Sequence, residues 1–533
     1  MAFLLSELIP TAAAQRPSAA ALGHSGTTLT YAQLARACKA CAAQILSQDL
    51  TRGERVAVYL DKRIETVTSI FGTAEAGGVF VPVNPILKAE QVGHILRDCN
   101  VRILVTSRDR LKILMAELSN CPDLRCVLVV DPGEDGTNDG KYRVVSWDAA
   151  MAPETPNRVR VIDTDMAAIL YTSGSTGKPK GVMLSHRNMV AGAQSVAAYL
   201  NNHADDRLLA VLPLSFDAGF SQLTTAFSTG ACVVLMNYLL PRDVIVTLER
   251  EKITGLTAVP PLWIQLAQLD WPASITTHLR YIANTGGRMP EATLTALRAR
   301  LPRTRPFLMY GLTEAFRSTY LPPEEIDRRP DSIGKAIPNA EILVLRDDGT
   351  PCAANEPGEL VHRGALVGMG YWNDPEKTAE RYKPLPNGVG GREAGMVIPE
   401  LAVFSGDTVR RDEEGFLYFI GRRDEMIKTS GYRVSPTELE EVLYAIQQLG
   451  EVAAFGVAHP VLGEAIIVVA TPRPGATVTA SDLKSECQCH LPAYMQPAVI
   501  DIREGPLPRN PNGKIDRKRL SGEFSEHFSK VAT

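Results

Sequence analysis

The sequence predicts an α/β protein with a large N-terminal body and a small C-terminal domain. Short β-branched runs alternate with stretches of helical periodicity over about 320 residues, and this alternation returns after Asp424. Between the two regions, Gly, Pro and short strands dominate. Because 533 residues exceed one ordinary domain, we expect a body at residues 1–422 and a C-terminal α/β domain at residues 423–533.

The individual elements follow from local patterns. The stretch YAQLARACKACAAQIL, from Tyr31, has apolar residues at helical spacing, whereas RVAVYL, VRILVT and RCVLVV are typical of buried strands. The runs ACVVLM, GLTAVP and RYIANTGG continue this alternation. EILVLRDDGTPC, GELVHRG and GFLYFIGRRDEMI then predict a β-rich layer with Asp-Gly and Glu-Gly turns. Finally, SPTELEEVLYAIQQL predicts a helix, and VAAFGVA and AIIVVAT predict strands.

Composition argues against several classes of partner. The formal net charge is -4, so the chain has no basic footprint for nucleic acid. The strongly apolar runs, such as ACVVLMNYLL, are much shorter than the roughly 20 residues that span a bilayer. The segment MAFLLSELIP carries Glu7 and has no basic residue before Arg16, which is the wrong order for a secretory signal. We therefore expect a cytoplasmic protein without a membrane span.

Nine cysteines are scattered without a repeated spacing, which indicates free thiols in a reducing compartment. One cluster, CQCH from Cys487 to His490, has the residue types of a metal corner but no second half at zinc spacing. It lies in DLKSECQCHLPAYMQP, which predicts an amphipathic helix ending before a proline. We expect the helix rather than a metal site.

The segment YTSGSTGKPKGVMLSH, Tyr171 to His186, concentrates anion-binding groups. Its small residues let the backbone turn tightly and direct amide and hydroxyl donors at one anion, while its lysines add full charges. A P-loop needs four residues between its first Gly and Gly-Lys, but only two separate Gly174 from Gly177 here, and Pro179 follows Lys178. The segment therefore predicts a phosphate cradle of another kind, the alternative being an ordinary flexible loop.

Three further segments carry candidate charges. LMYGLTEAF places Thr313 and Glu314 after an apolar strand and a Gly turn, where a carboxylate suits hydrated magnesium. Asp407 follows a Gly turn in FSGDT and suits a ribose diol. Lys514 follows an Asn-Gly turn in LPRNPNGKIDRKRL. Each motif alone is weak evidence.

Taken together and in this order, the motifs resemble the adenylate-forming superfamily of acyl-CoA synthetases, luciferases and peptide-synthetase adenylation domains. The resemblance runs from about Leu29 to Leu520 and includes AGGVFVPVNP and GELVHRGALVGMGYWNDPEKTAERY. It implies a body of two flanked β-sheets plus a distorted β-barrel, and a mobile C-terminal domain. The segment NGVGGREAGMVIPELAVFSGD further resembles the sequences of acyl-CoA ligases associated with bacterial exosortase and exopolysaccharide loci.

The resemblance also implies the chemistry. A carboxylate attacks the α-phosphate of ATP to give an acyl-adenylate and pyrophosphate, and a thiol then takes the acyl group. Two anions must approach each other, and unit charges about 4 Å apart repel by several kcal/mol at protein-like dielectric. By resemblance, Lys514 bridges the carboxylate and the α-phosphate, and Glu314, next to Thr313, binds Mg²⁺. The β- and γ-phosphates are gripped by Thr172, Ser173, Gly174, Ser175, Thr176, Gly177, Lys178 and Lys180.

The same resemblance assigns the nucleotide site and a hinge. The positions that match the nucleotide-binding motifs are Gly286, Gly287, Tyr310, Gly311, Asp407 and Arg422. For Gly286 and Gly287 the alternative is a plain turn after a strand. Asp424 occupies the hinge position, about which the C-terminal domain is expected to rotate between the two half-reactions.

The substrate pocket contains an informative departure. Phe216-Asp217 stands where many acyl-CoA ligases carry a His and where amino-acid-activating domains carry Phe-Asp, whose Asp holds the substrate amine. Alternatively, Asp217 caps a helix starting at Ala218, and Gly219 replaces the usual Ser of the amino-acid pattern. The other pocket positions are mostly small or polar, which favours a small polar acid over a long fatty acid. They are Ala258, Ala283, Thr285, Met309, Arg317 and Ser318.

The sequence leaves the thiol acceptor and some rivals open. Arg317 suits a second substrate carboxylate, or it pairs with Asp217 or Glu314. The acceptor is CoA or the phosphopantetheine of a separate carrier protein, since no GGxS segment follows Lys514. A phosphotransferase or ATPase predicts ADP as product, and a non-catalytic nucleotide-binding regulator predicts ATP binding without pyrophosphate exchange.

Overall fold

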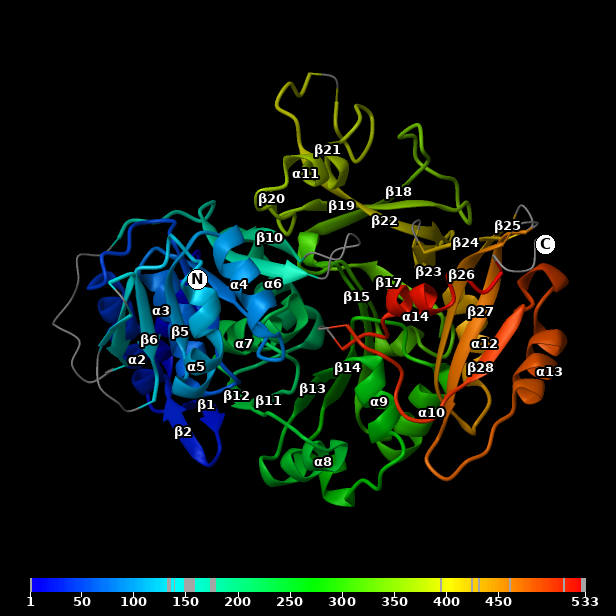
Figure 1. Cartoon of the computed structure of the whole chain (residues 1–533), viewed down its shortest axis with the longest axis horizontal. Coiled ribbons are helices and arrows are strands. Elements are labelled where there is room, and N and C mark those ends of the chain that lie inside the picture. Colours follow the sequence, from blue (N-terminus) through cyan, green and yellow to red (C-terminus); the bar gives the residue numbers. More distant parts are fainter. Residues whose placement is uncertain are drawn as a thin grey trace.

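A computed structural model gives the fold of the chain (Figure 1). It describes residues 2–131, 136–138, 140–147, 159–172, 179–393, 395–422, 425–429, 432–459, 462–510 and 513–528. In these residues, no helix combines the length and the apolar character needed to cross a membrane.

The larger sheet of the body has 14 strands among the described residues. Its centre is parallel, and the strands from β15 to β23 pair antiparallel. Along the sheet, the strands are β18 (Ala340–Leu345), β19 (Gly358–Gly364), β22 (Leu401–Arg411), β23 (Leu417–Arg422), β17 (Ser332–Ala336), β16 (Thr319–Leu321), β15 (Arg305–Tyr310), β14 (Tyr281–Asn284), β13 (Gly255–Ala258), β11 (Arg207–Ala210), β12 (Cys232–Leu235), β1 (Ala20–His24) and β2 (Thr27–Thr30), with β21 (Tyr382–Pro384) beside β22.

A second sheet of nine described strands forms the other half of the body. The runs RVAVY, VRILVT and CVLV form its buried parallel centre, as their β-branched composition predicts. Its strands, in order, are β20 (Gly370–Tyr371), β10 (Lys180–Ser185), β9 (Met166–Thr172), β4 (Val79–Pro82), β3 (Arg55–Tyr59), β5 (Val101–Thr106), β6 (Cys126–Val129), β8 (Tyr142–Ser146) and β7 (Gly136–Asn138).

Helices fill the space between the two sheets and cover their outer faces. The inner group shares one hydrophobic core with both sheets, in which Phe71 stacks on Phe220 and meets Phe227 edge to face. The inner helices are α1 (Leu8–Gln15), α2 (Tyr31–Leu46), α3 (Ile64–Glu75), α6 (His186–Leu200) and α7 (Asp217–Thr229). Outside the large sheet lie α8 (Pro241–Arg250), α9 (Pro260–Leu266) and α10 (Glu291–Arg300), and outside the second lie α4 (Ala89–Asp98) and α5 (Arg108–Leu118).

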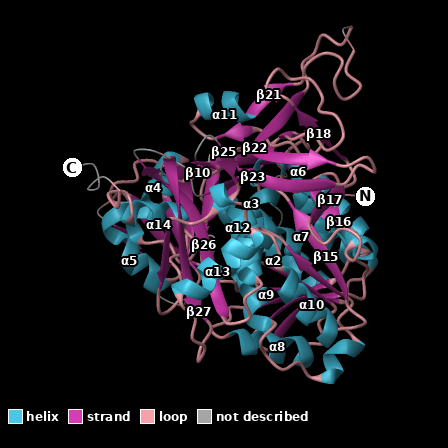
Figure 2. Cartoon of the chain, turned by 90° about the vertical axis from the view of Figure 1, so that its right-hand side faces the viewer, coloured by secondary structure: helices cyan, strands magenta, loops and turns pink. Residues whose placement is uncertain are grey.

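The C-terminal domain is a separate five-stranded sheet, counted over the residues the structure describes. Alternate residues of its two long strands face opposite sides, so α12 and α13 pack on one face and α14 on the other. Figure 2 shows α12 and α13 against the strands of this sheet. Its elements are β24 (Ile427–Thr429), β25 (Tyr432–Val434), α12 (Pro436–Tyr444), β26 (Leu449–His459), β27 (Gly463–Pro472), α13 (Ala480–His490), β28 (Val499–Ile502) and α14 (Arg517–Glu523).

These elements confirm the expected α/β fold, with one correction. The β-rich layer does not close into a barrel within the described residues; β16 and β17 pair, so the layer continues the large sheet as an open edge that ends at β18. The segment around CQCH forms α13, and the Cys487 thiol is buried in the C-terminal core. The position Asp424 lies outside the described residues, so the hinge and the domain boundary remain predictions.

Candidate active site

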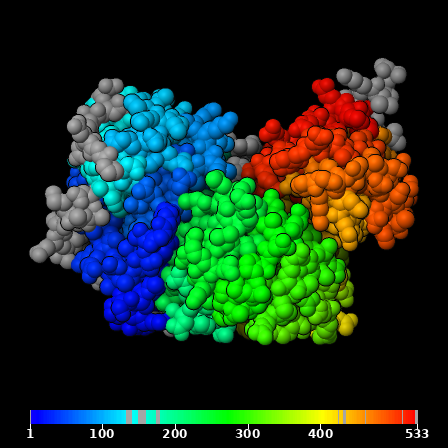
Figure 3. Space-filling model, turned by 90° about the horizontal axis from the view of Figure 1, so that it is seen from below, coloured from blue at the N-terminus to red at the C-terminus, as the bar shows by residue number. Residues whose placement is uncertain are grey.

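A large cavity lies between the body and the C-terminal domain. Its volume is ≈ 1810 Å³, and its walls come from both parts of the chain. In the space-filling view, the orange and red C-terminal residues rest against the green middle part of the body (Figure 3). The candidate residues that line this cavity are Thr172, Lys180, Asp217, Thr285, Gly286, Gly287, Met309, Tyr310, Gly311, Thr313, Glu314, Asp407, Arg422 and Lys514.

The phosphate segment joins two strands rather than a strand and a helix. Strands β9 and β10 form an antiparallel hairpin, in which Thr172 stands opposite Lys180. This agrees with the sequence argument against a P-loop, in which a helix would begin at the lysine. The predicted phosphate ligands Ser173, Gly174, Ser175, Thr176, Gly177 and Lys178 lie outside the described residues. The described ends of the hairpin both face the cavity.

Thr313 and Glu314 form a short 3-10 turn directly after strand β15. The turn ends at Phe316, whose φ of 56° is unusual for a residue with a side chain. Gly192 on α6 makes room for this ring, because a Cβ there would lie 2.3 Å from the Phe316 Cδ1. The Glu314 carboxylate accepts a hydrogen bond from the Tyr371 hydroxyl at 2.6 Å. The strained turn thus aims Glu314 at the cavity from the end of a rigid strand.

Asp407 and its neighbours form a second polar wall of the cavity. Asp407 on β22 stands opposite Arg422 on β23, and its Oδ1 lies 3.5 Å from the Arg422 Nε. Its other oxygen accepts a hydrogen bond from the Tyr310 hydroxyl. Burial raises the pKa of Asp407, and Arg422 opposes this shift. The buried Oδ1 has no hydrogen-bond donor within the described structure, which leaves it able to accept one from a ligand.

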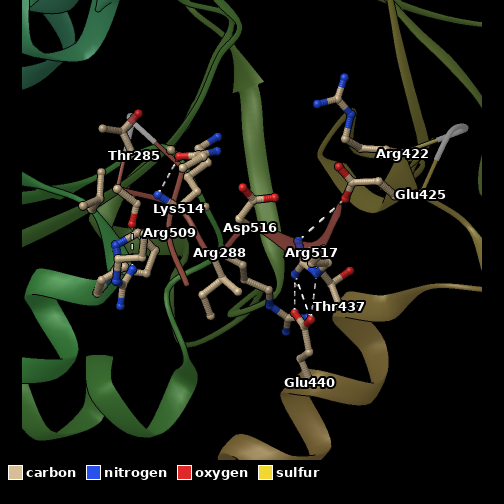
Figure 4. A pocket seen from close by; sticks show the side chains of 18 of the residues that line it. Thr285, Arg288, Arg422, Glu425, Thr437, Glu440, Arg509, Lys514, Asp516 and Arg517 are labelled. Atoms are coloured by element: carbon tan, nitrogen blue, oxygen red, sulfur yellow. Dashed lines mark hydrogen bonds and ion pairs between the residues drawn. The ribbon is translucent and has the colours of Figure 1, made fainter. Parts of the chain in front are cut away.

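Lys514 reaches the body from the C-terminal domain. Its Cε lies 3.8 Å from the position that a Cβ on Gly286 would occupy, and Gly286 itself has a φ of 77° that favours glycine. The Lys514 backbone closes a turn with Asn510 through bonds of 2.8 and 3.1 Å. The side chain is exposed to the cavity, and desolvation by the surrounding protein lowers the pKa of Lys514, with further help from Arg422. Figure 4 shows Lys514 beside Thr285.

Ion pairs surround the position of Lys514 (Figure 4). Arg517, three residues further along, binds Glu440 of α12 through contacts of 2.6 to 3.0 Å. The Arg288 Nε, in the loop after β14 of the body, lies 3.4 Å from Glu441 of α12. This second pair joins the body to the C-terminal domain. The domain is therefore held in an orientation that places Lys514 against the Gly286 loop.

Asp217 does not act as a helix cap in the structure. Helix α7 begins at Asp217 with Phe216 as the N-cap residue, and no side chain caps it. The Asp217 carboxylate instead accepts a hydrogen bond from Arg317 at 3.1 Å, and Thr313 Oγ1 lies 3.5 Å away. The Arg317 side chain is only 3% exposed. Of the alternatives left open for Asp217 and Arg317, the structure shows their mutual ion pair.

The remaining pocket residues lie behind the cavity wall, except Met309, which lines the large cavity as well. Arg317 and Met309 line a second, ≈ 20 Å³ cavity, which has room for about one water. Ser318 is fully buried, and its hydroxyl lies 2.9 Å from the His362 Nδ1. Three predicted pocket residues, Ala258, Ala283 and Ser318, are therefore buried residues outside the large cavity. Ala258 and Ala283 lie in the central strands β13 and β14, and Ser318 directly precedes β16.

The sequence motif GMGYW contains a site residue to which sequence reasoning assigned no role. Tyr371 belongs to β20, which pairs with β10, and this pairing carries its hydroxyl to Glu314. Arg381 also lines the cavity, and its Nη1 donates to the Phe404 carbonyl at 3.2 Å. The motif itself was the available signal, but no spacing rule shows that its tyrosine reaches a carboxylate 57 residues earlier.

Comparison with known proteins decides the family. The model of the AMP-binding enzyme family matches residues 9–372, and that of the AMP-binding enzyme C-terminal domain matches residues 438–514. The chain belongs to the AMP-binding enzyme family. The resemblance to adenylate-forming ligases that the sequence motifs indicated is thereby confirmed.

The relatives of this AMP-binding enzyme include ligases of similar size and much larger synthases. It is 32% identical to an L-proline–[L-prolyl-carrier protein] ligase of Streptomyces coelicolor, over 92% of this chain and 91% of the relative. It is 28% identical to gramicidin S synthase 2 of Aneurinibacillus migulanus, over 97% of this chain. The chain spans only 11% of the length of that synthase.

Solved structures share the whole architecture of this AMP-binding enzyme. The anthranilate CoA ligase AuaEII in complex with anthranoyl-AMP has a TM-score of 0.86 at 24% identity, with 98% of this chain and 97% of that chain covered. The o-succinylbenzoate CoA synthetase of Bacillus subtilis, in complex with ATP and magnesium ion, has a TM-score of 0.80 at 26% identity, with 96% and 98% covered. The first likeness establishes the fold alone.

The residues of the cavity fit ATP and Mg²⁺. The unsatisfied Asp407 Oδ1 is a ready acceptor for ribose hydroxyls. A Cβ on Gly286 or Gly287 would lie 3.2 Å from Val259 or Pro260, so glycine keeps this crowded part of the cavity wall free of side chains. Within the described chain, no cluster of three His, Cys, Asp or Glu side chains forms a complete metal cage. In nucleotide sites, Mg²⁺ is held by one or two carboxylates together with phosphate oxygens. Glu314 is the carboxylate in position for that role.

Proposed function

We propose that this enzyme activates a small carboxylic acid with ATP, releases pyrophosphate, and transfers the acyl group from the adenylate to a thiol. The observation that carries the proposal is the placement of Lys514 against the Gly286 loop, in one cavity with Asp407 and Glu314. Family membership supports the same chemistry.

Each charged residue has a task in this proposal. Lys514 neutralises the approach of the acid to the α-phosphate, while Thr172 to Lys180 hold the departing phosphates. Asp407 accepts hydrogen bonds from the ribose, and Arg422 keeps this carboxylate paired. Glu314, with Thr313 beside it, holds Mg²⁺, which when bound neutralises charge on the phosphates. Tyr310 and Gly311 close the nucleotide site together with the two glycines.

The pairing of Asp217 supports an acid without an ammonium group. A carboxylate that already has Arg317 as counter-ion gains less from a second cation than a free carboxylate would. We therefore place a small polar acid against Thr285 and Met309, with the ion pair as one wall. A long-chain acid is disfavoured, since the neighbouring cavity behind Met309 holds about one water.

A second candidate is the activation of an amino acid for a separate carrier protein. The proline-carrier ligase, at 32% identity over nearly its full length, favours this alternative. In this case Asp217 would divide its two oxygens between Arg317 and the substrate ammonium. CoA and a carrier phosphopantetheine both remain proposed acceptors.

We also propose that residues 423–533 rotate about Asp424 after adenylation, and that the enzyme is cytoplasmic. In support of the boundary, β23 ends at Arg422 in the large sheet, and the next described strand, β24, belongs to the C-terminal sheet. A change of orientation would withdraw Lys514 and free the cavity for a thiol.

A pyrophosphate-exchange screen tests the function. The enzyme is incubated with ATP, labelled pyrophosphate and panels of short acyl, aryl and amino acids. Adenylation predicts label in ATP that depends on one acid, with AMP as the product. Formation of ADP would indicate a phosphotransferase, and ATP binding without exchange for any acid would indicate a regulator. Exchange with amino acids alone would favour the second candidate.

The catalytic role of Lys514 makes a more specific prediction. Lys514→Ala should lower the exchange rate by about 10²-fold or more, because the charge that offsets the meeting of two anions is lost. Thioester formation from preformed adenylate should change much less. Lys484→Ala, which removes an exposed charge from α13 outside the residues that line the cavity, is the matched control. Equal losses in both half-reactions would contradict the role.

A further inference from the structure

Tyr371 touches two charged groups of opposite sign at the edge of the cavity. Its hydroxyl donates to Glu314 Oε1 at 2.6 Å, and the Lys180 Nζ lies 5.6 Å from the centre of its ring. Glu314 lies in the turn that follows β15 of the large sheet, Lys180 begins β10 of the second sheet, and both line the cavity. Tyr371 thus contacts both the carboxylate after β15 and the lysine at the start of β10.

The Tyr371 ring is held firmly in this position. Its backbone pairs with Val182 of β10, the strand that Lys180 begins, and its amide donates to Thr378 Oγ1 at 2.9 Å. The Tyr382 ring meets it edge to face, at 5.8 Å between centres and an interplanar angle of 85°. Only 6% of Tyr371 is exposed. The hydroxyl therefore has little freedom to leave Glu314.

The hydroxyl is the donor in this contact. An ordinary tyrosine, with a pKa of about 10, is protonated at neutral pH, and the ionised carboxylate can only accept. One Glu314 oxygen is thereby engaged, and the carboxylate is fixed in one orientation. The ring face gives Lys180 a favourable contact that does not involve the carboxylate. Without the ring, the two opposite charges would be free to pair with each other.

We propose that Tyr371 is a positioning residue that keeps Glu314 and Lys180 apart and directs both at the same polyphosphate. Its hydroxyl orients Glu314 toward a divalent cation, and its ring supports Lys180 toward the phosphates. This inference rests on the proposed function only in assuming that ATP and a divalent cation occupy the cavity. It predicts separate effects for the hydroxyl and the ring.

Binding measurements distinguish these two effects without turnover. The probe is Mn²⁺ with α,β-methylene-ATP, with bound Mn²⁺ followed by electron paramagnetic resonance. Tyr371→Phe keeps the ring and should weaken Mn²⁺ binding in the ternary complex about tenfold, since a hydrogen bond to a charged group is lost. The affinity for the metal-free analogue should not change. Tyr371→Leu also removes the ring and should weaken both.

The matched control is Tyr382→Phe, in the neighbouring ring of the same pair. Its hydroxyl lies 3.4 Å from the Glu314 carbonyl rather than at the carboxylate, so Mn²⁺ binding should stay near that of the wild type. Wild-type Mn²⁺ affinity in Tyr371→Phe, or an equal loss in Tyr382→Phe, would overturn the proposal. Because this readout is independent of pyrophosphate exchange, an absence of exchange in the wild type would reject the proposed function without deciding the role of Tyr371.

Discussion

At the residue scale, the pair of Asp217 and Arg317 is the feature that most limits the choice of substrate. The Arg317 guanidinium is nearly inaccessible, with 3% of its side chain exposed, whereas the Asp217 side chain is 13% exposed and lines the cavity. Arg317 Nε has no hydrogen-bond partner in the described structure. The two members of the pair therefore depend on each other to different degrees, because only Asp217 can reach water in the cavity.

This difference predicts unequal costs of removing each partner. Asp217→Asn leaves the Arg317 charge buried and should reduce the free energy of unfolding by about 3 kcal/mol. Arg317→Met should cost less, since the Asp217 carboxylate can be hydrated from the cavity. Urea unfolding followed by tryptophan fluorescence reports the body, where all four tryptophans lie. The prediction fails if Arg317→Met is the more damaging change or if Asp217→Asn is neutral.

At the element scale, helix α12 decides where the C-terminal domain rests. Its Glu440 anchors Arg517, close to Lys514, and the next residue, Glu441, meets Arg288 of the body. Burial raises the pKa of Glu441, and Arg288 opposes this shift. One turn of one helix thus connects the lysine segment with the loop that contains Gly286 and Gly287.

The contact between α12 and the body predicts a selective effect of Arg288→Ala. The pair is partly exposed, so its loss should weaken the adenylating orientation by at most about 1 kcal/mol and slow pyrophosphate exchange about two- to fivefold. Thioester formation from preformed adenylate should not slow. Arg298→Ala, which removes an exposed pair with Asp327 inside the body, should leave both rates unchanged. Equal slowing of both half-reactions by Arg288→Ala would contradict this role of the contact.

At the scale of the whole molecule, the sequence predicted what depends on local patterns. The helix at Tyr31–Leu46 was predicted over its full length, and its start is fixed by a capping box between Thr30 and Gln33. The sequence distinguished the phosphate hairpin from a P-loop because the spacing of glycine and proline residues determines the local backbone structure. Glu314, Asp407 and Lys514 were found because each follows a glycine-containing turn in a motif that resembles the family.

Contacts between distant segments could not be predicted in the same way. Tyr371 reaches Glu314 only because β20 pairs with β10, and Arg317 reaches Asp217 across 100 residues of chain. Both contacts are consequences of sheet order, which periodicity does not specify. The expected barrel was wrong for the same reason. Strand patterns indicate that strands exist, but not whether the edge strands of a layer pair with each other to close a barrel.

Two buried histidines predict how the body as a whole responds to acid. Burial lowers the pKa of His362 to about 3 and that of His186 to about 4, from an ordinary 6.5. Between pH 6.5 and these values, the unfolded chain binds protons that the folded chain cannot, so stability falls as pH falls through this window. Above pH 6.5 neither state binds them, and the two histidines contribute no pH dependence.

His362→Gln isolates one of these contributions. It removes the titrating ring at the Ser318 contact, so the variant should have a lower free energy of unfolding than the wild type at pH 7. When the pH falls from 7 to 5, the wild type should lose about 2 kcal/mol more of this free energy than the variant. Urea unfolding of both proteins at the two pH values measures the difference. A parallel series with His203→Gln, whose ring is half exposed, checks that the loss of any histidine does not produce the same difference. If wild type and His362→Gln lose stability in parallel on acidification, the ring must be protonated in the folded protein, and the acid sensitivity of the body must come from other groups.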